Sequence, residues 1–332
     1  WRDIHGLNDE QAVLQILRDE IDILVDLAGH TAGNRLALLA RKPAPIQATY
    51  LGYYGTTGLQ QVDYWITDAT LHPPEQEAVD PCSEERWRLP RAYVAYRPLP
   101  EAPAVAPLPM LQRGFPMLGS FNQSRKITRT TAERWMAVLK AMPTAHLFLK
   151  SKNLAEPTEA DRIRTLFGEL GLAPDRLHLE GHSPSVAAHL DRYREVDVAL
   201  DTFPYTGCTT TADALWMGVP VLSVAGSSMV SRQAAAVLVA AGQPQWICNG
   251  TEALVRQCQA LLADPAALAR QRLELRPQLL NSDLLNHSSL AEALAGSFRQ
   301  WWHRWLEAQF PEPAGGNQLE PWPLRLPPPP LA

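Results

Sequence analysis

Three consecutive hydroxyl residues, Thr209, Thr210 and Thr211, form the clearest chemical signal in this sequence. They follow an apolar segment at residues 196–200, which reads as a buried parallel strand, and they open a run of helix-forming residues. Backbone N–H groups at a helix start lack partners within the helix and carry the positive end of its dipole, so this position suits a phosphate. Asp213 then lies where its carboxylate could accept a hydrogen bond from a sugar hydroxyl. The alternative is that a threonine here only caps the helix.

Polar and basic residues follow a second predicted strand in the same way. Gln123 and Lys126 come directly after an apolar segment at residues 116–121 and precede a predicted helix at residues 131–142. Lysine supplies a point charge and glutamine both donates and accepts hydrogen bonds, which makes this a second candidate anion site. Lys126 is therefore a candidate catalytic residue. The alternative is an ordinary solvated lysine.

Two more polar loops follow predicted strands in the first part of the chain. His30 lies in the loop at residues 29–35 and is a candidate catalytic residue, because histidine can donate or accept a proton near neutral pH. The alternative is a structural hydrogen-bonding group, which is the more common role of a histidine in such a loop. The loop at residues 52–58 holds threonines and also glycines, which let the backbone approach a ligand closely. A tight turn is the alternative for this loop.

The alternation of segment types along the chain predicts the secondary structure that holds these loops. Short apolar segments alternate with amphipathic ones, which is typical of parallel sheets covered by helices, so the fold class is α/β. A final predicted helix at residues 284–306 carries tryptophans at helical spacing, which indicates a packing face. The predicted strands span residues 21–27, 48–51, 63–68, 86–89, 116–121, 147–150, 177–180, 196–200 and 219–224.

Chain length and proline content predict the domain organisation. A chain of 332 residues is long enough for two α/β domains of ordinary size. Prolines cluster at residues 98–109, which indicates a linker, and again at the end of the chain. We therefore expect an N-terminal domain at residues 1–110, a C-terminal domain at 111–310 and a proline-rich disordered tail at 311–332.

Composition excludes several classes of protein. A net charge of −5 argues against a general nucleic-acid binder, whose affinity would depend on neutralising phosphates. The four cysteines have spacings that match neither a zinc site nor a disulfide framework, so we expect no metal site and a cytoplasmic location. No apolar stretch reaches the length needed to span a membrane, so we expect no membrane partner.

Several strings occur together that resemble one known family, the O-linked N-acetylglucosamine transferases, which include SPINDLY-like and many bacterial proteins. The resemblance implies a GT-B fold, in which two Rossmann-like domains face each other across a cleft. It also implies that the N-terminal domain is truncated here, because the family's first strands would lie before Trp1. The strings are GHT at 29–31, RKPAPIQ at 41–47, LGYYGTTG at 51–58, FNQ at 121–123, DTFPY at 201–205 and ALW at 214–216.

The resemblance assigns roles to the residues of both anion loops. Gln123 and Lys126 match the residues that contact the diphosphate in the family, and the lysine would stabilise the leaving nucleotide. Thr209 and Thr210 match the threonines that hold the phosphates, and we place Thr211 in the same donor site.

Further matches concern the nucleoside and the sugar. Asp213 matches an aspartate that binds the ribose, and His189 matches a histidine near the uracil and the ribose, although a lone helical histidine is more often a packing residue. The loop that lies near the sugar corresponds to Gly55, Thr56 and Thr57.

Three residues depart from the family pattern. Cys208 replaces a histidine that often precedes the two threonines, Val186 stands where some relatives carry a base-contacting lysine, and Tyr54 replaces a proline. A histidine often assigned a catalytic role and the tetratricopeptide repeats of relatives would lie upstream. We therefore expect this chain to bind the donor better than it turns it over, and an upstream extension to restore turnover.

The resemblance implies an inverting, metal-independent glycosyltransferase that moves N-acetylglucosamine from UDP-GlcNAc to Ser or Thr hydroxyls of proteins. The expected partners are the nucleotide sugar and a protein or peptide acceptor, and no cofactor is needed. A GDP-fucose-dependent protein O-fucosyltransferase is one alternative, and a catalytically weak nucleotide-sugar-binding module is another. A nucleotide-sugar epimerase fits less well, because the acceptor-side loops match the transferases.

Overall fold

Two parallel β-sheets carry the loops described above. The computed structural model describes residues 1–311, so the predicted tail at 311–332 lies almost entirely outside the described residues. The first sheet has the order β1-β2-β3-β4 and the second the order β10-β9-β8-β5-β6-β7. The strands are β1 (Ile23–Asp26), β2 (Ile46–Thr49), β3 (Tyr64–Asp68), β4 (Glu85–Leu89), β5 (Met117–Ser120), β6 (His146–Lys150), β7 (Leu177–Glu180), β8 (Val198–Leu200), β9 (Val221–Val224) and β10 (Ile247–Cys248).

Every predicted strand is present, with its ends shifted by at most two residues. All strand pairs in both sheets are parallel, as the alternating pattern predicts. The α-helices are α1 (Asp9–Arg18), α2 (Leu36–Leu39), α3 (Met110–Arg113), α4 (Arg129–Ala141), α5 (Pro157–Glu169), α6 (Val186–Asp191), α7 (Thr209–Trp216), α8 (Gln233–Ala240), α9 (Gly250–Ala263), α10 (Pro265–Leu280) and α11 (His287–Gln309).

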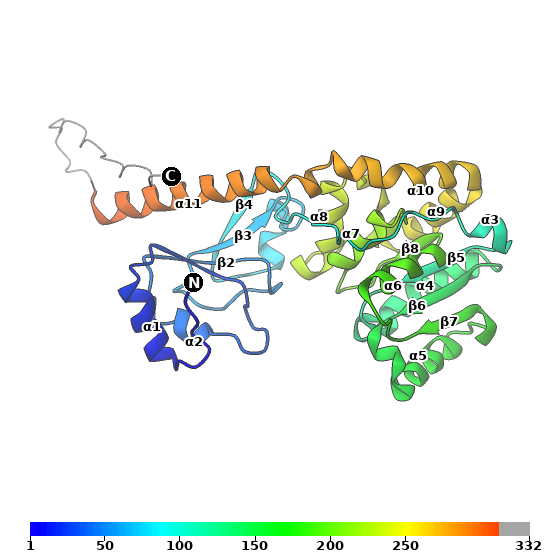
Figure 1. Cartoon of the computed structure of the whole chain (residues 1–332), viewed down its shortest axis with the longest axis horizontal. Helices are drawn as coiled ribbons and strands as arrows, with labels where there is room; N and C mark the ends of the chain where they lie inside the picture. The colour runs from blue at the N-terminus through cyan, green and yellow to red at the C-terminus, as the bar shows by residue number, and fades with distance from the viewer. Residues whose placement is uncertain (312–332) are drawn as a thin grey trace.

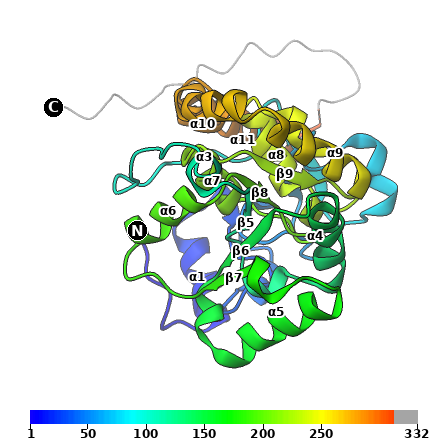
Figure 2. The same cartoon turned by 90° about the vertical axis from the view of Figure 1, so that its right-hand side faces the viewer.

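The second sheet is the core of the larger unit and has helices on both faces. Strands β5, β8 and β9 are buried along their length, and β6 is buried from Leu147 onward, which explains why they read as apolar runs. Figure 2 shows α6 and α7 on one side of this sheet and α4 on the other. The strand order reverses between β5 and β8, which are neighbours although far apart in sequence. Open α/β sheets bind ligands at such a reversal, outside the carboxyl ends of the strands.

Helix α11 packs against the first sheet, although it follows the second sheet in the chain. It runs from the second unit along the first sheet (Figure 1). Trp301 is fully buried and its ring stacks on that of Tyr64, with centroids 4.4 Å apart. Trp87 Nε1 donates to Ser297 Oγ at 2.8 Å. The packing face predicted for the tryptophans is thus confirmed for Trp301, although the predicted domain limits assign this helix to the second domain.

The segment between the two units, residues 98–109, has no regular structure and crosses from the first unit to α3 (Figure 1). Arg272 of α10 holds it in place. This guanidinium is fully buried and donates to the carbonyl oxygens of Ala106 at 2.7 Å, Val196 at 2.7 Å and Tyr193 at 3.0 Å. The linker is therefore fixed to the same segment that leads into strand β8.

Candidate functional site

A buried carboxylate organises the loop that follows strand β8. Asp201 accepts hydrogen bonds from Asn122 Nδ2 at 3.1 Å, Thr202 N at 2.9 Å, Gly207 N at 2.8 Å and Ser223 Oγ at 2.7 Å. Burial raises the pKa of Asp201, and the hydrogen bond from Ser223 opposes this effect. The carboxylate thus ties the loops after β5 and β8 together at the point where the strand order reverses. Sequence reasoning assigned Asp201 no role, although a charged residue at the end of an apolar strand was a visible signal.

Helix α7 begins at the predicted phosphate loop, and its threonines occupy different environments. The N-cap residue is Cys208, whose side chain makes no capping hydrogen bond, so the threonines form the first turn rather than the cap. Thr209 is exposed and Thr210 half-buried, whereas Thr211 is buried at 2% exposure. Thr210 Oγ1 donates to Asn122 Oδ1 at 3.1 Å. Only the first two hydroxyl residues therefore lie toward the open side of the loop.

Lys126 reaches the same loop from strand β5. The residue belongs to the 3₁₀ turn Ser124–Lys126, and its Nζ donates to Thr206 O at 2.9 Å. Burial lowers the pKa of Lys126, while the carboxylate of Asp201 raises it. Gln123 stands at the start of this turn and is exposed. The structure therefore brings the two predicted anion loops together, and Lys126 is half-buried rather than freely solvated.

Asp213 lies one turn into α7 and is bound by a residue that sequence reasoning did not identify. The hydroxyl of Tyr96 donates to Asp213 Oδ1 at 2.5 Å. Burial raises the pKa of Asp213, and the hydrogen bond from Tyr96 opposes this effect. Tyr96 lies between strand β4 and the segment at residues 98–109, so the residue expected to bind the ribose, Asp213, is held by the chain that leads out of the first sheet.

His189 borders a cavity of about 400 Å³ between α6 and the preceding loop. Its ring makes an edge contact with Phe121, the residue that precedes the first anion loop, at a centroid distance of 5.5 Å. Burial, followed by the charge of Lys150, lowers the pKa of His189. The cavity is lined by Lys152, Gly181, His182, Ser183, Pro184, Ser185, Val186 and His189.

In the first unit, the structure joins the two predicted polar loops. His30 is exposed, and its Nε2 lies 3.1 Å from Thr56 O. Thr56 Oγ1 donates to Glu84 Oε2 at 2.6 Å, and Thr57 N donates to Glu84 Oε1 at 2.7 Å. Both threonines of the Gly55-Thr56-Thr57 loop thus hold its backbone through Glu84, a residue that sequence reasoning missed.

The loops of the two units meet through aromatic residues. Tyr54 contacts the ring of Tyr205 edge-on, with centroids 6.2 Å apart and planes at 73°. The hydroxyl of Tyr93 lies 3.6 Å from Cys208 Sγ at the start of α7. The loop that carries Tyr54 therefore meets the loop after strand β8, to which Lys126 also donates a hydrogen bond.

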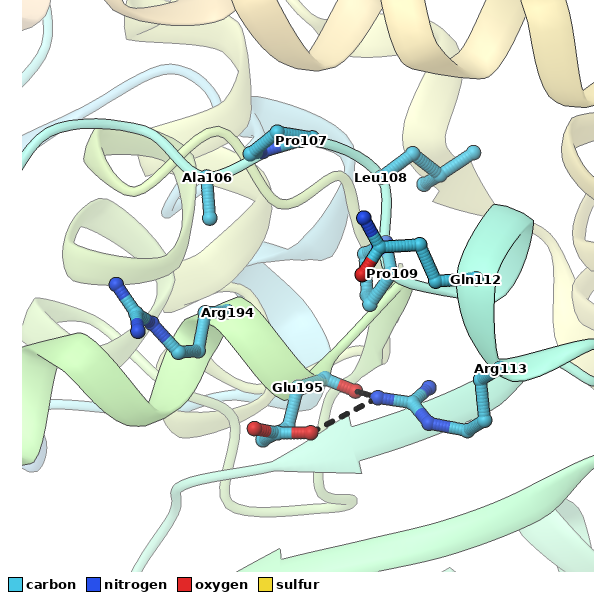
Figure 3. Close-up of a pocket in the computed structure, with 8 residues that line it drawn as sticks. All are labelled: Ala106, Pro107, Leu108, Pro109, Gln112, Arg113, Arg194 and Glu195. Carbon is cyan, nitrogen blue, oxygen red and sulfur yellow. Dashed lines mark hydrogen bonds and ion pairs between the residues drawn. The ribbon is translucent and has the colours of Figure 1, made fainter.

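A second cavity, of about 480 Å³, lies beside the linker and contains none of the predicted site residues. Figure 3 shows that two of its charged residues pair, since Arg113 Nη2 donates to Glu195 Oε2 at 2.9 Å. It lies near α3, which precedes strand β5, and so at the opposite end of that strand from Lys126. We assign the chemistry to the carboxyl ends of β5 and β8.

Within residues 1–311, no group of three or more His, Cys, Asp or Glu side chains is arranged to hold a metal ion. No helix among the described residues is long and apolar enough to cross a membrane. All four cysteines are unpaired.

A family model described as glycosyl transferase family 41 matches residues 5–95 and 115–294. The chain is 36% identical over 311 residues to a protein of Arabidopsis thaliana named probable UDP-N-acetylglucosamine–peptide N-acetylglucosaminyltransferase SPINDLY, covering 94% of this chain and 34% of that protein. A second Arabidopsis protein, named SEC with the same activity, is 29% identical, covering 93% of this chain and 32% of its own length. The chain thus spans about a third of the length of these relatives.

Solved structures give the same match. A mutant O-GlcNAc transferase of Thermobaculum terrenum superposes with a TM-score of 0.86 and 35% identity, covering 93% of this chain and 58% of that one. The Anabaena protein Alr3699/HepE, solved with UDP and glucose, has a TM-score of 0.57 at 11% identity, covering 90% and 83% of the two chains. The second likeness concerns the fold alone.

Proposed function

Because this chain belongs to glycosyl transferase family 41, we propose that it transfers N-acetylglucosamine from UDP-GlcNAc to a Ser or Thr hydroxyl of a protein. Its fold is GT-B, as predicted. The observation that carries the proposal is the hydrogen bond from Lys126 to the loop that leads into α7, at the strand reversal between β5 and β8. The named activities of the SPINDLY and SEC relatives and of the Thermobaculum enzyme support the donor and the acceptor.

The geometry accounts for how the donor's diphosphate would leave. Lys126 uses one N–H on Thr206 O, so two remain for phosphate oxygens. The free backbone N–H groups of Thr209 and Thr210 add the positive end of the helix dipole. Charge that develops on the diphosphate is thus met by groups already in place, which is the largest source of rate enhancement in many enzymes.

The acceptor hydroxyl would attack the anomeric carbon from the side opposite the diphosphate. In that single displacement, the new bond to the acceptor oxygen forms as the bond to the phosphate oxygen breaks, which inverts the anomeric configuration. His30 is the candidate base. Its Nε2 faces a carbonyl oxygen, that of Thr56, which can only accept, so Nε2 carries the proton and Nδ1 is left free to accept one.

The direct test is UDP release from UDP-GlcNAc in the presence and absence of an acceptor peptide. We expect acceptor-dependent release of UDP that continues in the presence of a chelator. Donor binding without release would favour the nucleotide-sugar-binding module instead. Stronger stabilisation by GDP-fucose than by UDP-GlcNAc in a thermal shift assay would favour the O-fucosyltransferase. The donor base needs this test because Val186, which lines the His189 cavity, stands where some relatives carry a base-contacting lysine.

Two substitutions should separate phosphate binding from ribose binding. On UDP binding, the Thr210 hydroxyl would exchange its hydrogen bond to Asn122 Oδ1 for one to a phosphate oxygen. Thr210→Val removes this hydroxyl, so UDP should bind more weakly by about 0.5 to 1.5 kcal/mol, whereas free uridine should bind almost unchanged. Asp213→Asn should weaken uridine and UDP alike, because the ribose common to both loses a charged acceptor. Calorimetric titration of both ligands against both variants measures this. Equal losses for uridine and UDP in Thr210→Val would contradict the phosphate role.

A further inference from the structure

The ammonium of Lys126 rests on an aromatic ring. Its Nζ lies 3.8 Å from the centroid of the Tyr205 ring, while it also donates to the carbonyl of the next residue, Thr206. A cation close to the face of an aromatic ring is attracted by the ring's quadrupole. The two contacts together define where the charged end of this lysine points.

The ring of Tyr205 is itself held from two sides. Thr202 Oγ1 donates to Tyr205 O at 2.6 Å, which fixes the backbone within the loop that Asp201 organises. From the first unit, the ring of Tyr54 packs against the Tyr205 ring in an edge-to-face arrangement, with 6.2 Å between centroids. Tyr205 nevertheless stays 36% exposed, so it is not simply a core residue.

We propose that Tyr205 is a positioning residue, which seats the Lys126 ammonium against the leaving diphosphate, and that Tyr54 steadies the ring from the opposite side of the interface. This inference rests on the proposed transferase function. It assigns a role in the reaction to a residue that does not itself reach the phosphates. It also links the loop at 52–58 of the first unit to the lysine of the second.

The ring does what an aliphatic side chain of similar size cannot. It supports the ammonium through its face without taking any of the N–H donors, so the donors not used by Thr206 remain for the diphosphate. A leucine at this position would fill space but would leave the lysine tail free to adopt other rotamers. The hydroxyl of Tyr205 has no role in this account, which makes phenylalanine the matched control.

The test compares Tyr205→Leu with Tyr205→Phe in the intact protein, with UDP release from UDP-GlcNAc as the assay. We expect Tyr205→Leu to lower kcat roughly three- to thirtyfold while the KM for the donor changes little, since the loss concerns the transition state. Tyr205→Phe should keep kcat near that of the wild type. A fall of the same size in Tyr205→Phe, or no fall in Tyr205→Leu, would overturn the proposal.

A pH profile adds a readout that a merely structural role would not move. Burial lowers the pKa of Lys126, the charges of Asp201 and Cys208 raise it, and the charge of Arg125 lowers it. The ring favours the charged form of the lysine, so its removal in Tyr205→Leu lowers the lysine pKa further. Activity should then fall at a lower pH on the alkaline side than in the wild type or in Tyr205→Phe.

The same experiment separates this inference from the proposed function. Wild-type protein that releases no UDP from UDP-GlcNAc and no GDP from GDP-fucose would contradict the transferase function itself. If the wild type is active but Tyr205→Leu loses activity at the same alkaline pH as the wild type, only the role of Tyr205 is contradicted.

Discussion

Replacing Lys126 with alanine should lower the rate of sugar transfer by about a hundred- to a thousandfold, which corresponds to roughly 2.7 to 4 kcal/mol of transition-state stabilisation. The lysine contacts the loop that leads to α7, because its Nζ donates to Thr206 O at 2.9 Å. The charge on the diphosphate grows as the sugar leaves, so the loss should appear mainly in kcat. Steady-state measurement of UDP release, with donor affinity from calorimetry, checks this.

Arg125 provides the matched control for this substitution. It is the neighbouring residue, carries the same charge and is exposed, but no side-chain hydrogen bond links it to the loop. Arg125→Ala should therefore change the rate by no more than about twofold, as surface substitutions usually do. If Lys126→Ala also stayed within that range, the lysine would have no part in stabilising the leaving group.

The sequence predicted the strands well because burial on both faces leaves a strong local signal. Strands β5 and β8 read as apolar runs, and the residues after them, Lys126 and Thr209 among them, were singled out by that position alone. Chain order and apolar pattern also implied parallel pairing. The carboxyl ends of parallel strands lie at one edge of the sheet, so the two anion loops could be expected to meet.

What the sequence could not predict are contacts between segments far apart in the chain. Tyr96 binds Asp213 across 117 positions, and Glu84 binds Thr56 across 28. Trp301 packs on Tyr64 of the first sheet although α11 follows the second unit. No local pattern marks such partners. The burial of Thr211 was likewise hidden, because three identical residues in a row give no sign of which one faces inward.

The site is thus assembled by residues from both units rather than by one loop. Tyr54 reaches Tyr205, and Tyr93 reaches Cys208, so the position of the phosphate loop depends on the first unit. Cys208 and Tyr54 were noted in the sequence as departures from the family pattern. In the structure both residues lie at the interface between the two units.

The largest effect on stability should come from Asp201→Ala. This carboxylate is the common acceptor for two backbone N–H groups and for the side chains of Asn122 and Ser223. Alanine would leave these donors without a partner where water has little access, and unsatisfied buried donors cost about 1 to 3 kcal/mol each. Because the loop can relax in part, we expect unfolding to cost about 3 to 5 kcal/mol less free energy than in the wild type.

Asp201→Asn is the control that keeps the shape of the side chain. Its amide oxygen can still accept from Asn122, Thr202 and Gly207, and only the pairing with Ser223 must change, so the loss should be about 1 to 2 kcal/mol. Urea unfolding followed by tryptophan fluorescence would show the midpoint of Asp201→Asn between those of the wild type and Asp201→Ala. Equal midpoints for the two variants would mean that the negative charge, and not the set of hydrogen bonds, holds the loop that seats Lys126.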